Sequence, residues 1–159
     1  MNTDYIITLI HWGEEYKNIE NETQRQLSDF LAKHGCNLIV GAHPHAVQPI
    51  KKITGNATDS VLVAYSLGNF VSNQRWRYSD GGIMFEVTLT KTDGIVNMNN
   101  YRYEPFWVHR YPEKGAQLYR LIPIIDYLSN PERYPVMSLN DKKMLMQFYN
   151  DTKEIIPVF

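Results

Sequence analysis

The chain has one cysteine, no excess of basic charge and no long apolar run, and each absence narrows the class of protein. The single Cys36 has no partner for a disulfide within the chain. Its 16 Lys and Arg against 17 Asp and Glu give a net charge of −1, without the cationic surplus typical of nucleic-acid binding. No run of about 18 apolar residues is present, and the first residues lack the features of a secretion signal. We therefore expect no nucleic-acid partner and no membrane segment in this chain.

Three apolar runs predict the buried strands of an α/β fold. Residues 5–10 and 61–66 are nearly continuous runs, as in strands that are buried on both faces of a sheet, and 38–40 is a shorter one. A helix is predicted between the first and the second, from a capping pattern at 23–26 to Gly35. Strand, helix and strand form one βαβ unit, whose parallel strands bring their carboxyl ends to the same edge of the sheet.

The second half of the chain predicts antiparallel strands and a final helix. The predicted elements are strands at 82–90 and 95–103 with a hairpin turn at 92–94, a short strand at 119–124 and a helix at 139–153 capped by Ser138. Pro123 confines the short strand to the edge or the end of a sheet. We expect a domain over residues 1–125 and a helical appendage over residues 126–159.

Histidine stands at the ends of two predicted parallel strands. His11 follows the first apolar run, and His43 and His45 follow the second. Neutral imidazole is the commonest ligand for transition metals and a proton-transfer group near neutral pH. Because strand ends of a parallel sheet converge, these residues predict a metal or anion site. A polar cluster with structural hydrogen bonds is the alternative interpretation.

Four other polar residues are candidates for contacts with a substrate. The Glu15 carboxylate can orient a histidine, although a solvated loop glutamate fits the same pattern. Asn69 follows the third strand in a Gly-Asn pair, which turn formation alone also explains. Arg75 and Arg77 lie on a polar loop, where they either bind an anionic polymer or are simply solvated.

Three segments resemble, in order, the bacterial capsule-synthesis protein family CapA, the poly-γ-glutamate biosynthesis proteins. They are His11-Trp12-Gly13 with Glu15-Tyr16, then Gly41-Ala42-His43-Pro44-His45, then Tyr65-Ser66-Leu67-Gly68-Asn69-Phe70. Through that family the chain is similar to calcineurin-like metallophosphoesterases. The resemblance implies an α/β fold that is the C-terminal half of a four-layer α/β/β/α metallophosphatase-like sandwich, with a mixed sheet containing a βαβ unit and a following antiparallel hairpin. It also implies that His11, His43 and His45 bind a divalent metal, namely Mn, Zn or Fe.

The resemblance further implies that an Asp and an Asn-His pair, which the family carries in its first half, are missing from this chain. Two dications a few Å apart repel unless anionic oxygen lies between them, and three neutral histidines supply no charge. We therefore expect weak, incomplete metal binding and no catalysis by the isolated chain. A metallophosphoesterase-like hydrolase is expected only when the missing half completes the site.

The family implies a bacterial protein of capsule or poly-γ-glutamate biosynthesis, at the cell envelope or its extracellular face, that handles an anionic polymer or a phosphate-type substrate. The alternative is a non-catalytic scaffold or export component with a vestigial metal site. Half a sandwich would leave an apolar sheet face uncovered, and large exposed apolar patches are unusual for a monomer. We therefore expect a homo-oligomer or a partner that supplies the missing half.

Overall fold

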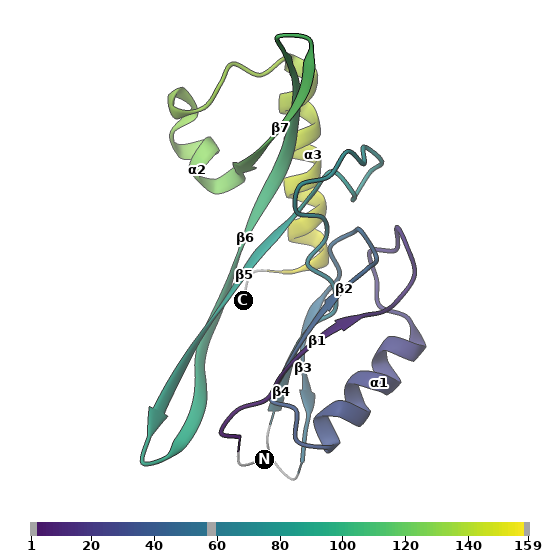
Figure 1. The fold of residues 1–159 in the computed structure, drawn as a ribbon, viewed down its shortest axis with the longest axis vertical. Coiled ribbons are helices and arrows are strands. Elements are labelled where there is room, and N and C mark those ends of the chain that lie inside the picture. Colours follow the sequence, from purple (N-terminus) through teal and green to yellow (C-terminus); the bar gives the residue numbers. More distant parts are fainter. Residues whose placement is uncertain (1–2, 57–59, 158–159) are drawn as a thin grey trace.

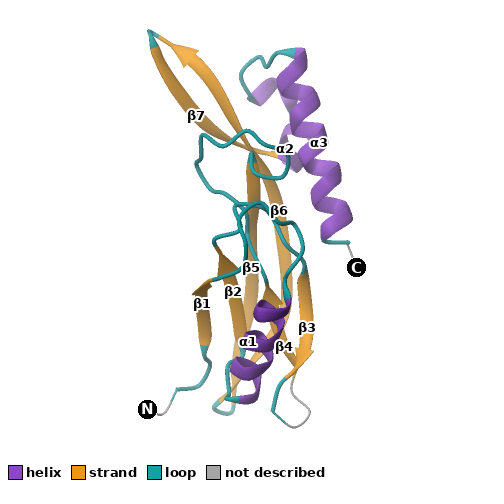
Figure 2. Cartoon of the chain, turned by 90° about the vertical axis from the view of Figure 1, so that its right-hand side faces the viewer, coloured by secondary structure: helices purple, strands orange, loops and turns teal. Residues whose placement is uncertain are grey.

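The computed structural model describes residues 3–56 and 60–157, which form two β-sheets with helices packed outside them (Figures 1 and 2). In chain order the elements are β1 Ile7–His11, α1 Glu22–Lys33, β2 Leu38–Ala42, β3 Ile50–Thr54, β4 Ser60–Ala64, β5 Gly81–Thr92, β6 Ile95–Glu113, β7 Ala116–Pro123, α2 Ile124–Ser129, a 3-10 turn at Pro131–Arg133 and α3 Leu139–Ile155. Figure 1 shows the β5–β6 hairpin running along most of the molecule.

The first sheet is mixed and contains the expected βαβ unit. Its strand order is β1-β2-β4-β3, in which β1, β2 and β4 are parallel and β3 is antiparallel to β4. The register pairs His11 at the end of β1 with Ala42 at the end of β2. The prediction that these strand ends meet at one edge of the sheet is therefore confirmed.

The two sheets and the helices form layers. One face of the first sheet packs on α1 through a cluster of Trp12, Ala32, Cys36, Ile39, Val61, Val63 and Tyr65. The other face shares a larger core with the antiparallel sheet β5-β6-β7 and with α3. Leu62 in β4, Trp107 in β6 and Leu145 in α3 all belong to that core and are at most 1% exposed. The expected α/β class, with a mixed and an antiparallel sheet in a partial sandwich, is confirmed.

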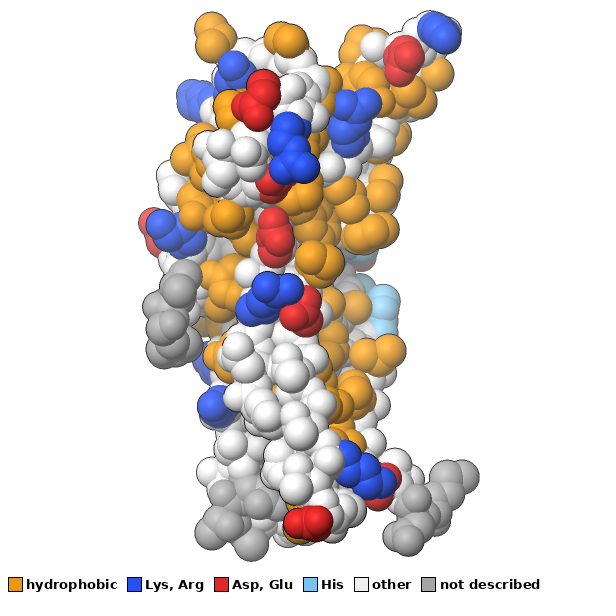
Figure 3. Space-filling view, turned by 90° about the vertical axis from the view of Figure 1, so that its left-hand side faces the viewer, with side chains coloured by type: hydrophobic (Ala, Val, Ile, Leu, Met, Phe, Trp, Pro, Cys, Tyr) orange, Lys and Arg blue, Asp and Glu red, His pale blue; other side chains and the backbone are white. Residues whose placement is uncertain are grey.

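One expectation about burial is wrong. The first apolar run is not buried on both faces, because β1 is an edge strand whose Ile7 and Leu9 side chains are 48% and 79% exposed. Thr8 and Ile10 point instead to the α1 side, where the Thr8 hydroxyl lies 3.1 Å from Cys36 Sγ. Leu9 lines an open apolar groove of about 490 Å³ together with His11, Val40, Phe70, Ile83 and Phe106. Figure 3 shows hydrophobic side chains gathered along this flank beside an exposed histidine.

Two elements and one helix cap differ from the sequence-based expectations. Strand β3 was not predicted, because Lys51 and Lys52 interrupt its apolar pattern, and the short helix α2 was not predicted either. The cap of α1 is Asn21 rather than Thr23. The Asn21 side chain accepts from the backbone N–H of Gln24, and Gln24 Oε1 accepts from that of Asn21.

The final helix forms as predicted and packs into the main core. Ser138 caps α3 through a hydrogen bond from the Asp141 backbone N–H, and Leu145 and Phe148 are 0% and 3% exposed. Within residues 3–56 and 60–157, no helix combines the length and the apolar character needed to cross a bilayer.

The packing of α3 leads to a prediction about stability. Leu145→Ala should lower the free energy of unfolding by about 2–5 kcal/mol, because it removes buried methyl groups and leaves a cavity in the shared core. Leu139, in the first turn of the same helix, is 86% exposed, so Leu139→Ala is the matched control and should change stability by less than about 0.5 kcal/mol. Urea denaturation followed by circular dichroism measures both. Equal effects would mean that α3 does not help to close the core.

Candidate metal centre

The structure brings the three predicted histidines together. His11 ends β1, and His43 and His45 lie in the loop that follows β2. The ring centroids of His11 and His43 are 4.2 Å apart, and those of His43 and His45 are 6.2 Å apart. The cluster sits at the carboxyl edge of the parallel strands, where α/β sheets place their ligands.

A carboxylate joins two of these imidazoles. One oxygen of Glu15 and one ring nitrogen each from His43 and His45 lie within 4.8 Å of one another. Glu15 Oε1 is 3.9 Å from Nε2 of His45. One carboxylate and two imidazoles form a donor set that suits Zn²⁺, Mn²⁺ or Fe²⁺. Glu15 is therefore a candidate metal ligand itself, in addition to a group that can orient a histidine. His11 lies outside this set, but its ring contacts His43.

The hydrogen bonds of Asn69 determine which nitrogen of His45 is free. Asn69 Nδ2 lies 2.8 Å from the carbonyl oxygen of Ser79, which can only accept, so this atom is the donor side of the amide. Asn69 Oδ1 must then accept a hydrogen bond from Nδ1 of His45, at 2.8 Å. Neutral His45 therefore carries its lone pair on Nε2, which faces Glu15. An imidazole oriented in this way by an outer partner is typical of metal ligands.

The loops that carry the cluster adopt strained backbone conformations. His43, His45 and Tyr16 have φ angles of 104°, 56° and 63°, in a region that residues other than glycine rarely occupy. The Tyr16 backbone N–H donates to the carbonyl oxygen of Pro44 at 2.6 Å, which ties the two loops together. Such strain costs of order 1–3 kcal/mol per residue and persists only where surrounding contacts enforce it.

A short hydrogen-bond chain closes the site on its outer side. Gln74 accepts from Asn69 Nδ2 at 2.8 Å and donates to the Tyr16 hydroxyl at 3.3 Å. Loss of hydration, together with the negative charge of Glu15, raises the pKa of Tyr16 above its usual value. The tyrosine therefore stays protonated at neutral pH and serves as a hydrogen-bonding group.

Gly41 lets the end of β2 pack closely against its neighbours just before the loop that carries His43 and His45. A Cβ at this position would lie 2.1 Å from the carbonyl oxygen of Tyr65 and 2.3 Å from Nε1 of Trp12. These two atoms are themselves joined by a 2.8 Å hydrogen bond in which the indole N–H donates. Only glycine fits at this close approach, so the end of β2, from which the histidine loop leaves, is held against Trp12 and Tyr65.

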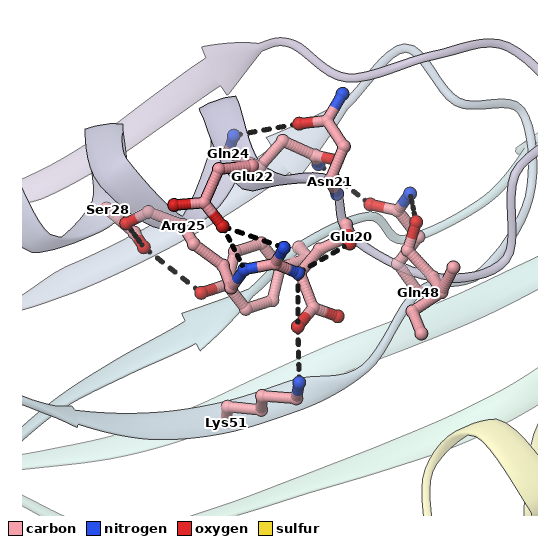
Figure 4. A network of polar contacts seen from close by, with 10 residues as sticks. Glu20, Asn21, Glu22, Gln24, Arg25, Ser28, Gln48 and Lys51 are labelled. Carbon is pink, nitrogen blue, oxygen red and sulfur yellow. Dashed lines mark hydrogen bonds and ion pairs between the residues drawn. The ribbon is translucent and has the colours of Figure 1, made fainter.

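A buried pair of glutamines holds the Glu15 loop, and sequence reasoning did not identify it. Gln24 and Gln48 are 1% and 0% exposed, and Gln24 Nε2 donates to Gln48 Oε1 at 2.8 Å. Gln48 Nε2 in turn donates to the backbone carbonyl oxygens of Lys17 and Ile19. Figure 4 shows this pair beside a second polar group, in which the buried Glu20 contacts Arg25 and Lys51.

The two arginines predicted to bind an anionic polymer have partners within the chain. Arg75 donates to the carbonyl oxygen of Val108 and lies over the Trp107 ring at 5.9 Å. Arg77 forms two hydrogen bonds, of 2.7 and 3.0 Å, with the Asp151 carboxylate on α3. Both guanidinium groups therefore anchor the loop at 70–80 against β6 and α3.

The site belongs to an α/β chain in which parallel strand ends present a carboxylate–imidazole cluster. Residues 1–74, which contain the whole cluster, match the family described as bacterial capsule synthesis protein PGA_cap. The resemblance to the CapA family is thereby confirmed for this part of the chain.

Two relatives extend the comparison. The chain is 37% identical to the PGA biosynthesis protein CapA of Bacillus subtilis over 57% of its length, and 28% identical to the capsule biosynthesis protein CapA of Bacillus anthracis over 96%. These alignments cover 22% and 30% of the two relatives, so the chain spans less than a third of either protein.

The geometry predicts that Glu15 and His45 contribute to metal binding. Glu15→Gln and His45→Ala should each weaken Zn²⁺ or Mn²⁺ binding by about tenfold or more, and binding should weaken as the pH falls, because a protonated imidazole has no lone pair for a metal. Calorimetric titration of the metal measures the effect. His34→Ala is the control, since this exposed histidine at the end of α1 bonds only to its own helix. If the Glu15 and His45 variants bind as tightly as the parent, the cluster is not a metal site.

Proposed function

We propose that this chain acts in the biosynthesis of a bacterial capsule polymer, and that Glu15, His43 and His45, with His11 beside them, form part of a divalent-metal centre. The observation that carries this proposal is the carboxylate–imidazole cluster within the residues that match the capsule synthesis family. A divalent metal at this position would supply a Lewis acid for a phosphate or carbonyl oxygen. We place the protein at the cell envelope, as the family resemblance implies.

The chain's own donors fit one metal better than two. Glu15 is the only carboxylate in the cluster, and its side chain is half exposed. A pair of dications needs bridging anionic oxygen, and neutral imidazoles provide none. We therefore propose that further anionic ligands of a metallophosphatase-like centre come from polypeptide outside these 159 residues, in line with the much greater length of the two relatives. In such a centre Asn69 keeps His45 in the tautomer that binds metal.

The second candidate is a scaffold or export component in which the cluster is vestigial. The open apolar groove beside β1 and the exposed Leu9 favour this second candidate, because such a surface is suited to binding another protein chain. The two candidates differ in whether capsule formation needs the ligand side chains.

A genetic experiment separates them. A strain whose gene for this protein carries Glu15→Gln and His45→Ala should lose most of its surface polymer, because the metal centre loses two of its donors. His34→Ala, at the exposed end of α1, should leave the polymer unchanged. Extraction and quantification of the polymer, with the protein level checked by immunoblot, is the measurement. Normal polymer in the double variant would exclude the metal-dependent role and support the scaffold.

We also propose that a second copy of the chain covers the apolar face around Leu9. Light scattering after size exclusion should then report a dimer or a larger species at micromolar concentration, because a symmetric dimer buries the same patch twice. Leu9→Asp should shift the species toward monomer. Val136→Asp is the control, since Val136 is 99% exposed and lies outside the groove. A monomeric parent protein would contradict self-association and leave a separate polypeptide as the partner.

A further inference from the structure

Tyr16 lies beside the candidate metal centre in a conformation that its surroundings must enforce. It follows Glu15 directly and has a φ angle of 63°. Its ring stacks on the His45 ring with the centroids 5.9 Å apart, and the Trp76 ring packs against it at 5.2 Å. Both contacts are at the surface, because Tyr16 and Trp76 are 41% and 63% exposed. Strained residues of this kind cluster at functional sites, so the Tyr16 hydroxyl is a candidate for a role in this one.

A chain of hydrogen bonds fixes which way the Tyr16 hydroxyl donates. The Ser79 carbonyl oxygen can only accept, so Asn69 Nδ2 is a donor, and Gln74 Oε1 accepts from the same nitrogen at 2.8 Å. Nε2 is then the donor end of the Gln74 amide, and it donates to the Tyr16 hydroxyl oxygen at 3.3 Å. Because that oxygen accepts here, the single proton of the hydroxyl points away from Gln74 and is available to another acceptor.

The acceptor beside this proton is the Glu15 carboxylate. Loss of hydration raises the pKa of Tyr16 most, and the charge of Glu15 and a hydrogen bond with it raise that pKa further. The same carboxylate has its Oε1 atom 3.9 Å from Nε2 of His45. Tyr16 therefore meets both residues of this pair, His45 through its ring and Glu15 through its hydroxyl. The Glu15 side chain is 50% exposed, so a contact of this kind limits its freedom to turn toward solvent.

We infer that Tyr16 is a positioning residue, whose hydroxyl donates to the Glu15 carboxylate and holds it toward His45. The inference rests on the proposed metal centre and adds a residue that acts through one of its ligands. Ligating carboxylates accept hydrogen bonds from outer groups, and loss of such a group lowers metal affinity by about 10–100-fold. Asn69 fixes the ring nitrogens of His45 and, through Gln74, the direction of the Tyr16 proton. One amide thus orients both an imidazole and a carboxylate.

The test is a calorimetric titration of Zn²⁺ into the whole chain and its variants. Tyr16→Phe keeps the ring and loses only the hydroxyl, and it should weaken binding about tenfold. Glu15→Gln/Tyr16→Phe should bind no more weakly than Glu15→Gln alone, because the hydroxyl acts through the carboxylate that both of these variants lack. Tyr78→Phe is the matched control and should retain the parent affinity, since Tyr78 also has a positive φ angle, of 73°, but packs its ring on Arg77.

The double variant separates positioning of Glu15 from a general loosening of the site. If Tyr16→Phe disturbed the loops as a whole, it would also weaken the imidazole contacts and reduce binding further in the Glu15→Gln background. Additive losses, an unchanged affinity of Tyr16→Phe, or an equal loss in Tyr78→Phe would each overturn the inference and leave the metal centre in place. No binding by the parent would overturn both, so failure of the proposed function and failure of this inference give different results.

Discussion

The position of the candidate metal centre depends on a buried hydrogen-bonded pair of glutamines. Gln48 is fully buried, and its amide donates to two backbone carbonyl oxygens in the loop that carries Glu15. Gln24 holds that amide in the right orientation from α1. An apolar side chain at position 48 would remove both of these partly buried hydrogen bonds, at a cost of about 0.5–1.5 kcal/mol each. The Glu15 carboxylate therefore lies near His45 because of polar contacts made beneath the loop, away from the cluster itself.

The convergence of the histidines was predictable from the sequence, whereas the place of Glu15 was not. Parallel strands joined by one helix share an edge whatever their side chains, so His11 and His43 had to meet once the βαβ unit was recognised. Glu15 lies in an irregular loop, and its position is set by bonds between residues 29 and 31 positions apart. No local pattern encodes such contacts. The resemblance to the CapA family located the motif, and the structure showed which of its side chains face one another.

The errors in the sequence-based fold have a common physical origin. Apolar periodicity shows that a segment seeks burial, but it does not show whether a neighbour is available to bury it. Val61 to Ala64 lie in the central strand β4 and are buried on both faces, while the equally apolar β1 is an edge strand that leaves Leu9 exposed. Conversely, β3 is a strand despite Lys51 and Lys52, because an edge strand can direct charged side chains to solvent.

The loop before α1, which carries Glu15, is held by polar contacts along its length. It carries Glu15 near its start and the buried Glu20 near its end, and Glu20 contacts Arg25 on α1 and Lys51 on β3. Only the carboxylate is buried, at 2% exposed, while Lys51 and Arg25 are 47% and 45% exposed, so these cations compensate a charge that has little access to water. The amide of Gln48 fixes the middle of the same loop. The loop that presents the Glu15 carboxylate to His45 is therefore held by polar contacts at its middle and at its end.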